Sequence, residues 1–295
     1  MRLLLAATVA ALVGGGAVLA QDKPAPAGGA PAPATTAPLA AAPPAAALPG
    51  SEAMVAHRAA YRLTFDRARD NSDVARAEGV MLFEVLDACD GWASRQRLTL
   101  RMFDRDGQAL ETASDYATWE SKDGRRLRYS MTQASNGAVT NRITGEAELN
   151  PDGTGTARYD SPAARTETLP SGTLLPMVHT IRAIEAARAG RRILQAPLMD
   201  GTSEDGAQDS TTTLLGWQRE AQPSPRFPLL ASQESGRMRI AFFGRDQGNG
   251  GASSPEYEVG LRYYANGVAD EMNMDFGEFA VNGRLETLEA VPGGC

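Results

Sequence analysis

Apolar and polar residues alternate along most of the chain after residue 51, which is the pattern of half-buried β-strands. Residues 92–103 show it clearly, because Arg95, Arg97 and Arg101 alternate with Gln96 and Leu98. Similar runs predict strands at residues 61–65, 79–86, 92–103, 109–121, 126–131, 138–149, 154–159, 192–198, 210–217, 228–235, 238–243 and 257–264.

Turn-forming dipeptides separate these runs. Asn-Gly and Asp-Gly favour the tight turns that join neighbouring antiparallel strands. We therefore expect an antiparallel meander with hairpin turns at Asp106-Gly107, Asp123-Gly124, Asn136-Gly137, residues 151–153, Asn266-Gly267 and Asn282-Gly283.

One helix interrupts the strands. Pro176 suits a first helical turn, either Ser171 or Thr173 can cap it, and Gly190 suits its end. An apolar stripe predicts that one side of the helix packs against the sheet, through Met177, Val178, Ile181 and Ile184.

The pattern predicts an all-β fold, mostly antiparallel, with about thirteen or fourteen strands. A sheet with so many strands must curl or close to protect its edges. We therefore expect a large curled sheet or an open, spiral-like β-barrel, with the helix packed on one face or at one opening.

The first fifty residues do not have this pattern. Residues 1–20 have the apolar run and small-residue end of a cleaved secretory signal. Residues 21–50 are almost all Ala and Pro, which cannot form a core and predict a disordered tether. Residues 51–295 then form a single domain, without a later membrane span.

Cys89 and Cys295 are the only cysteines. In an exported protein two cysteines usually pair, which predicts an internal disulfide. Two free thiols and a bond between two molecules remain the alternatives.

The chain has a formal net charge of −7, and its sequence contains no run of basic residues. This argues against nucleic acid as a partner, and against an anionic lipid surface held by charge alone.

Residues that could carry catalysis are few. The chain lacks a Gly-x-Ser-x-Gly elbow, and only His57 and His179 could act as imidazole bases. Asp87 and Asp90 could form a carboxylate pair for sugar hydrolysis, but they also read as a turn. The acidic residues 200–209 do not have calcium-loop spacing. We therefore predict no catalytic residue, no metal site and no cofactor.

The order of several motifs resembles the EipB family of cell-envelope integrity proteins of Gram-negative bacteria. These are Asp-Ala-Cys-Asp-Gly-Trp at residues 87–92, Trp-Glu-Ser-Lys-Asp-Gly-Arg-Arg-Leu-Arg-Tyr at 119–129, residues 172–179, Asp200-Gly201, and the stretch from Tyr257 to Cys295. The resemblance implies a periplasmic protein, a spiral-like open β-barrel of about fourteen strands with a helix against it, and a disulfide between Cys89 and Cys295.

The function that follows is a non-enzymatic, periplasmic role in cell-envelope integrity. The protein would bind a lipid, a cell-wall component or an envelope protein. Candidate cavity residues are Tyr61, Phe65, Trp92, Trp119, His179 and Phe276. The alternative is a periplasmic hydrolase that acts on wall or lipid through His179 or a carboxylate pair.

Overall fold

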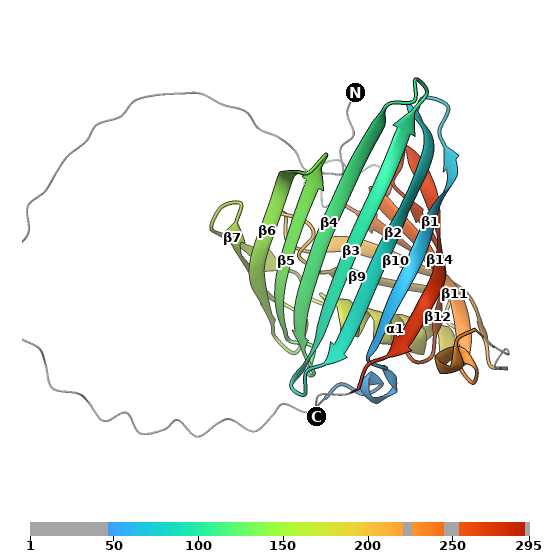
Figure 1. Ribbon diagram of the computed structural model, residues 1–295. Helices are drawn as coiled ribbons and strands as arrows, with labels where there is room; N and C mark the ends of the chain where they lie inside the picture. Colours follow the sequence, from blue (N-terminus) through green and yellow to red (C-terminus); the bar gives the residue numbers. More distant parts are fainter. Residues whose placement is uncertain (1–46, 221–225, 245–253, 293–295) are drawn as a thin grey trace, which may run out of the picture. The chain divides into compact units, whose positions relative to one another are not determined.

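The computed structural model describes residues 47–220, 226–244 and 254–292 (Figure 1). This part of the chain contains fourteen strands, one α-helix and two short 3₁₀ helices, η1 (Ser51–Ala53) and η2 (Pro228–Leu230). The other elements are β1 (His57–Ala68), β2 (Val74–Asp87), β3 (Gly91–Asp104), β4 (Ala109–Ser121), β5 (Arg126–Ser135), β6 (Ala138–Leu149), β7 (Gly155–Ser161), β8 (Arg165–Leu169), α1 (Pro176–Arg188), β9 (Ile193–Leu198), β10 (Gln208–Gln218), β11 (Ser235–Phe243), β12 (Tyr257–Tyr264), β13 (Ala269–Asp275) and β14 (Phe279–Ala290).

All fourteen strands belong to one antiparallel sheet, in the order β8-β7-β6-β5-β4-β3-β2-β1-β14-β13-β12-β11-β10-β9. Every sequential pair is a neighbour except β8 and β9, which form the two edges, and β1 pairs with β14 in the middle (Figure 1). The sheet does not close, because β8 and β9 are not paired with each other. The predicted all-β, open-barrel fold class is therefore confirmed.

The sheet curls so that its two halves touch. Tyr159 on β7 donates its hydroxyl proton to the Ser203 carbonyl at 2.9 Å and accepts the Gly206 N–H at 3.0 Å, both in the loop between β9 and β10. Tyr116 on β4 also donates to the Asp200 carbonyl in that loop. Around these contacts lies a core of buried side chains: Leu127, Tyr129, Met131, Ile143, Ala147, Ala157, Tyr159, Leu169, Leu175, Val178, Met199 and Ala207.

Helix α1 carries the chain from one sheet edge to the other. It follows β8, precedes β9 and packs against β9 and β10. Its buried residues lie on more than one side: Val178, His179, Ile181, Ala183, Ile184, Ala186 and Ala187. The packed helix is thus confirmed, and more of its surface is buried than the single apolar stripe predicted from the sequence.

Asn282-Gly283 was wrongly predicted to be a hairpin turn. It lies inside β14, and the turn before that strand contains Gly277, with φ +84°. Gly283 has an ordinary extended backbone, but a Cβ there would approach Leu63 and Met272 at 3.2 Å. The glycine is needed for close packing and not for a turn.

Two other local predictions need correction. Residues 228–235 are not a strand, because Pro228 begins η2 and the Asn266 side chain donates to the Leu229 carbonyl at 2.9 Å. Neither predicted cap is used either: the Thr173 hydroxyl donates to the Pro170 carbonyl, and Leu175 occupies the N-cap position without a side-chain bond. Strands β8, β13 and β14 had no counterpart among the predicted runs.

The packed part of the chain begins inside the predicted tether. Leu48 packs against the core, and its N–H donates to the Lys122 carbonyl at 3.0 Å. The predicted signal peptide and Cys295 lie outside the described residues. Helix α1, the one α-helix of the described ranges, is too short and too polar to be a membrane span.

Candidate functional site

Four aromatic rings stack in a row where β11, β12 and the turn between β13 and β14 meet. The ring centroids are 5.7 Å apart for Phe242 and Tyr257, 5.3 Å for Tyr257 and Phe276, and 5.2 Å for Phe276 and Phe279. We call these four residues the aromatic row. Phe279 is buried, whereas the other three are only half-buried.

The aromatic row belongs to the inner face of the curled sheet. Phe242 lies on the same face of β11 as Met238 and Ile240, which are both buried, and it is opposite Tyr257 in the register of β11 and β12. Buried rings this large normally complete their packing. A row that leaves three of its four rings partly open is a surface able to bind an apolar group.

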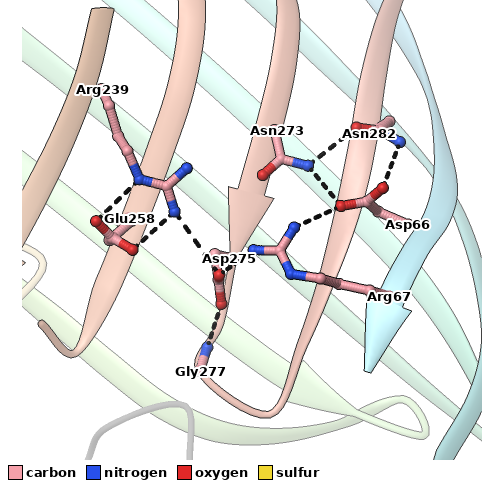
Figure 2. A network of polar contacts seen from close by, with 8 residues as sticks. All are labelled: Asp66, Arg67, Arg239, Glu258, Asn273, Asp275, Gly277 and Asn282. Atoms are coloured by element: carbon pink, nitrogen blue, oxygen red, sulfur yellow. Dashed lines mark hydrogen bonds and ion pairs between the residues drawn. The ribbon is translucent and has the colours of Figure 1, made fainter. Parts of the chain in front are cut away.

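A polar network covers the opposite face at the same end of the sheet (Figure 2). The network spans five neighbouring strands, and Figure 2 labels its members: Asp66 and Arg67 on β1, Asn282 on β14, Asn273 and Asp275 on β13, Glu258 on β12 and Arg239 on β11, with Gly277 in the turn. Arg239 holds Glu258 through two bonds of 3.0 and 2.7 Å.

Asp66 gathers amide donors within this network. Asn273 donates to its carboxylate at 3.0 Å and Asn282 at 3.2 Å, and Asn273 also bonds to Asn282 at 2.9 Å. The Asn273 bond is the main reason why the pKa of Asp66 lies below its ordinary value, and Asn282 and Arg67 act in the same direction.

Asp275 connects the polar network to the aromatic row. Its carboxylate accepts the Gly277 N–H at 2.9 Å and pairs with Arg67 at 2.6 Å and Arg239 at 3.8 Å. Gly277 directly follows Phe276, so these bonds fix the turn that carries an aromatic ring (Figure 2). The outer network therefore positions the inner surface.

Replacing Asp275 with alanine is expected to lower the free energy of unfolding by about 2 kcal/mol, since charge-assisted hydrogen bonds contribute roughly 1.5–3 kcal/mol. Asp275→Asn keeps an acceptor for Gly277 and should cost about half as much. Urea denaturation measures both. Asp115→Ala is the matched control, because its pair with Arg97 is largely exposed, and it should cost under about 1 kcal/mol. A loss for Asp275→Ala no greater than the control would contradict this role.

A second group of polar side chains fixes helix α1. Glu120 on β4 accepts the Met177 N–H at 2.7 Å and the Val178 N–H at 3.1 Å, so it satisfies free donors at the helix start. Glu120 is 3 % exposed, and burial raises its pKa to about 8, although both N–H bonds oppose that shift. The Glu120 side chain is therefore a helix cap supplied by a distant strand.

His179 lies on the buried side of the same helix. Its Nε2 is 3.3 Å from the Thr212 hydroxyl on β10, and burial lowers its pKa to about 4. The imidazole is therefore neutral near pH 7. Next along the helix, the Thr180 hydroxyl lies 3.5 Å from the Tyr263 hydroxyl on β12.

The predicted cavity residues are spread over the fold, and among the described residues no ring contact or hydrogen bond joins any two of them. Tyr61 is buried and donates to the Ala269 carbonyl at 2.8 Å. Trp92 is buried under the Lys122 ammonium, 3.3 Å from the ring centroid. Phe65 is half-buried on β1, and Phe276 belongs to the aromatic row.

Trp119 lies on the outer face of β4. It alternates with buried Thr118 and Glu120, which places it on the other side of the sheet. Its ring lies near the Arg126 and Arg128 guanidinium groups, at 5.9 and 5.5 Å from the ring centroid.

The other candidate groups form structural contacts. Asp87 pairs with Lys122 at 2.9 Å and accepts the Cys89 N–H at 3.0 Å, as expected for a turn. Arg95, Arg97 and Arg101 are exposed on the outer face of β3. Across the part of the chain that the structure describes, no three potential metal ligands gather in one place.

Sequence reasoning missed Glu120 and most of the aromatic row. Glu120 is far from α1 in sequence, so no local capping pattern could reveal it. Phe242 and Tyr257 read as ordinary strand residues, and only the pairing of β11 with β12 brings them together.

Comparisons with known proteins agree with this architecture. A family model described as EipB-like matches residues 49–292. The chain is 29% identical over 241 residues to the cell envelope integrity protein EipB of Brucella abortus (strain 2308), covering 80% of this chain and 84% of that protein. A crystal structure from Brucella abortus, described as a β-barrel-like protein of a domain of unknown function, matches with a TM-score of 0.72 and 27% identity over 81% of this chain and 99% of that one. The chain therefore belongs to the EipB-like family.

Proposed function

We propose that this protein is exported to the periplasm and maintains the integrity of the cell envelope as a non-catalytic binding protein. The observation that carries this proposal is the family match over residues 49–292, because it covers nearly the whole folded part. The relative from Brucella abortus is named as a cell envelope integrity protein and is matched over 84% of its length, which supports the same role. The predicted secretory signal supports export.

The aromatic row is our candidate binding surface. Phe242, Tyr257 and Phe276 are half-buried and come from three different segments, with Phe242 stacked on Tyr257 and the Phe276 ring tilted against Tyr257. Aromatic side chains bind apolar groups over a large area with little loss of conformational entropy. An acyl chain of a lipid or lipoprotein, or an apolar segment of an envelope protein, fits this chemistry.

The hydrolase alternative has less support from the geometry. His179 contacts Thr212 and is buried in the helix packing. Asp87 already pairs with Lys122, and Glu120 already accepts an N–H group at the start of α1. General base catalysis requires a group within hydrogen-bond reach of a substrate proton, and these groups are already bonded inside the chain.

Deleting the gene in the bacterium that encodes this protein tests the role. We expect increased uptake of a membrane-impermeant dye and lower survival in detergent. The wild-type gene and Phe103→Ala should restore both, because Phe103 is half-buried but lies outside the aromatic row. Phe276→Ala should restore them only in part.

Two results would change the proposal. An unchanged envelope after deletion would remove the integrity role. His179→Ala protein that is folded and equally stable, yet fails to restore the envelope, would favour the hydrolase.

A further inference from the structure

A depression of about 470 Å³ lies over β13 and β14, where the chain just before η2 passes by. Arg226, Arg237 and Arg284 line it together with Asp270 and Glu271. The size is within the range of small-molecule sites. Arginine is the side chain best suited to bind phosphate and carboxylate groups in a bidentate manner.

Arginines outnumber carboxylates around this depression. Glu286 is shared by Arg62 at 3.6 Å and Arg226 at 3.8 Å. Both distances exceed those of a charge-assisted hydrogen bond, so neither guanidinium is firmly held.

A second carboxylate is also shared by two arginines, which it holds more closely, because Arg237 donates a hydrogen bond to Glu271 and Arg262 lies 3.2 Å from it. Glu271 pairs with both Arg237 and Arg262. Asp270 is engaged by the backbone, since it accepts the Glu271 N–H at 2.7 Å and the Leu285 N–H at 3.0 Å. The charged residues that line the depression and their ion-pair partners therefore include five arginines and three carboxylates, in a chain whose net charge is −7.

Arg284 has the least favourable surroundings. It lies directly opposite Arg62 in the register of β1 and β14, and both side chains are exposed. Within the described residues it forms no hydrogen bond and no ion pair. Like charges placed opposite each other on a sheet are destabilising. Arg284 therefore lowers the stability of the fold and has no partner within the described residues. A side chain kept in such a place is suited to bind an anion from outside the protein.

We propose that this depression binds a phosphate ester, with Arg284 as its principal ligand and Arg226 and Arg237 beside it. A discrete phosphate group fits better than a whole anionic surface, because the net charge of −7 repels such a surface. The phosphate ester can be soluble or can be the head group of a lipid. The site rests on the chain's own geometry, so its failure would leave the envelope role unaffected.

Binding of sn-glycerol 3-phosphate by titration calorimetry, and flotation with phosphatidylcholine vesicles with or without phosphatidylglycerol, test the site. Arg284→Gln should weaken binding about tenfold. Arg95→Gln is the matched control, since Arg95 is also an exposed outer-face strand arginine, and should bind as the wild type does. Binding of the soluble probe indicates a free ester, and binding of phosphatidylglycerol vesicles alone indicates a lipid head group.

The melting temperature separates this role from a structural one. Without an anion, Arg284→Gln should melt at or above the wild-type temperature, because it removes the repulsion by Arg62. Three results would overturn the proposal: a clearly lower melting temperature of Arg284→Gln, an equal loss of binding in Arg95→Gln, or no binding of either probe by the wild type.

Discussion

Replacing Glu120 with alanine is expected to lower the free energy of unfolding at about pH 4.5 by about 3 kcal/mol, since each of the two N–H groups left without a partner costs roughly 1–3 kcal/mol. Met177 and Val178 would lose the only side-chain acceptor at the start of α1 that the structure describes. Because α1 joins the two edge strands, its loosening should also loosen β8 and β9. Urea denaturation measures the loss, and hydrogen exchange at the helix amides locates it.

Glu120→Gln is the matched control. Glutamine keeps one acceptor oxygen and the same volume, so it should retain more stability than alanine at pH 7. The two variants also separate the acceptor from the side-chain volume: equal losses in Glu120→Gln and Glu120→Ala would show that one acceptor oxygen of the same volume does not support the start of the helix.

The same pair predicts a pH dependence. The folded-state pKa of Glu120, about 8, lies above its ordinary value of 4.5, so between these values the folded protein holds a proton that the unfolded chain has lost. The stability that Glu120 contributes is therefore complete below about pH 4.5 and is lost as the pH rises towards 8. Between pH 5 and 8 the wild type should lose on the order of 2–4 kcal/mol relative to Glu120→Gln. If the free energy of unfolding changed with pH in the same way for the wild type and Glu120→Gln, the raised pKa would be contradicted.

Reduction of the proposed Cys89–Cys295 disulfide is expected to lower the melting temperature substantially. A closed loop of about 200 residues corresponds to roughly 5 kcal/mol in the chain-entropy model, and measured values usually fall below it. The geometry supports this pairing, because Val85 on β2 and Ala290 on β14 are both opposite His57 on β1. The last residues of β2 and β14 therefore lie at the same end of the sheet. Only β1 separates the two strands, which places them about 10 Å apart.

Cys89→Ser and Cys295→Ser should each reproduce the effect of reduction. Mass spectrometry of the unreduced protein should give a monomer lighter by two hydrogens than the reduced one. A dimer on a non-reducing gel would favour the intermolecular bond instead, and an unmoved melting temperature would rule out a stabilising disulfide.

The fold class followed from local pattern, because strand alternation and turn dipeptides act over a few residues. Gly107 and Gly137, with φ of +81° and +80°, occupy the turns that Asp-Gly and Asn-Gly predict. Asn282-Gly283 has the same dipeptide and lies inside a strand, where the glycine makes room for Leu63 and Met272. Sequence does not distinguish a glycine that turns from one that packs.

The candidate sites were less predictable because they join residues from distant elements. The start of α1 is capped from β4, although Thr173 next to it looked suitable. The arginines of the proposed phosphate site come from β11, β14 and the loop before η2, so the sequence showed no basic run although the structure brings them together. Such sites depend on register, which is set by the whole sheet.

The pairing of β1 with β14 has a consequence for the order of folding. The first strand is completed only by the last one, with eleven residue pairs between His57–Ala68 and Phe279–Ala290. Contacts between such distant segments require a long loop to close before they repay its entropy, which slows folding. A chain still emerging from the ribosome would carry β1 with one open edge, and that edge can pair with another chain. We therefore expect this protein to need a chaperone, or dilution, until β14 arrives.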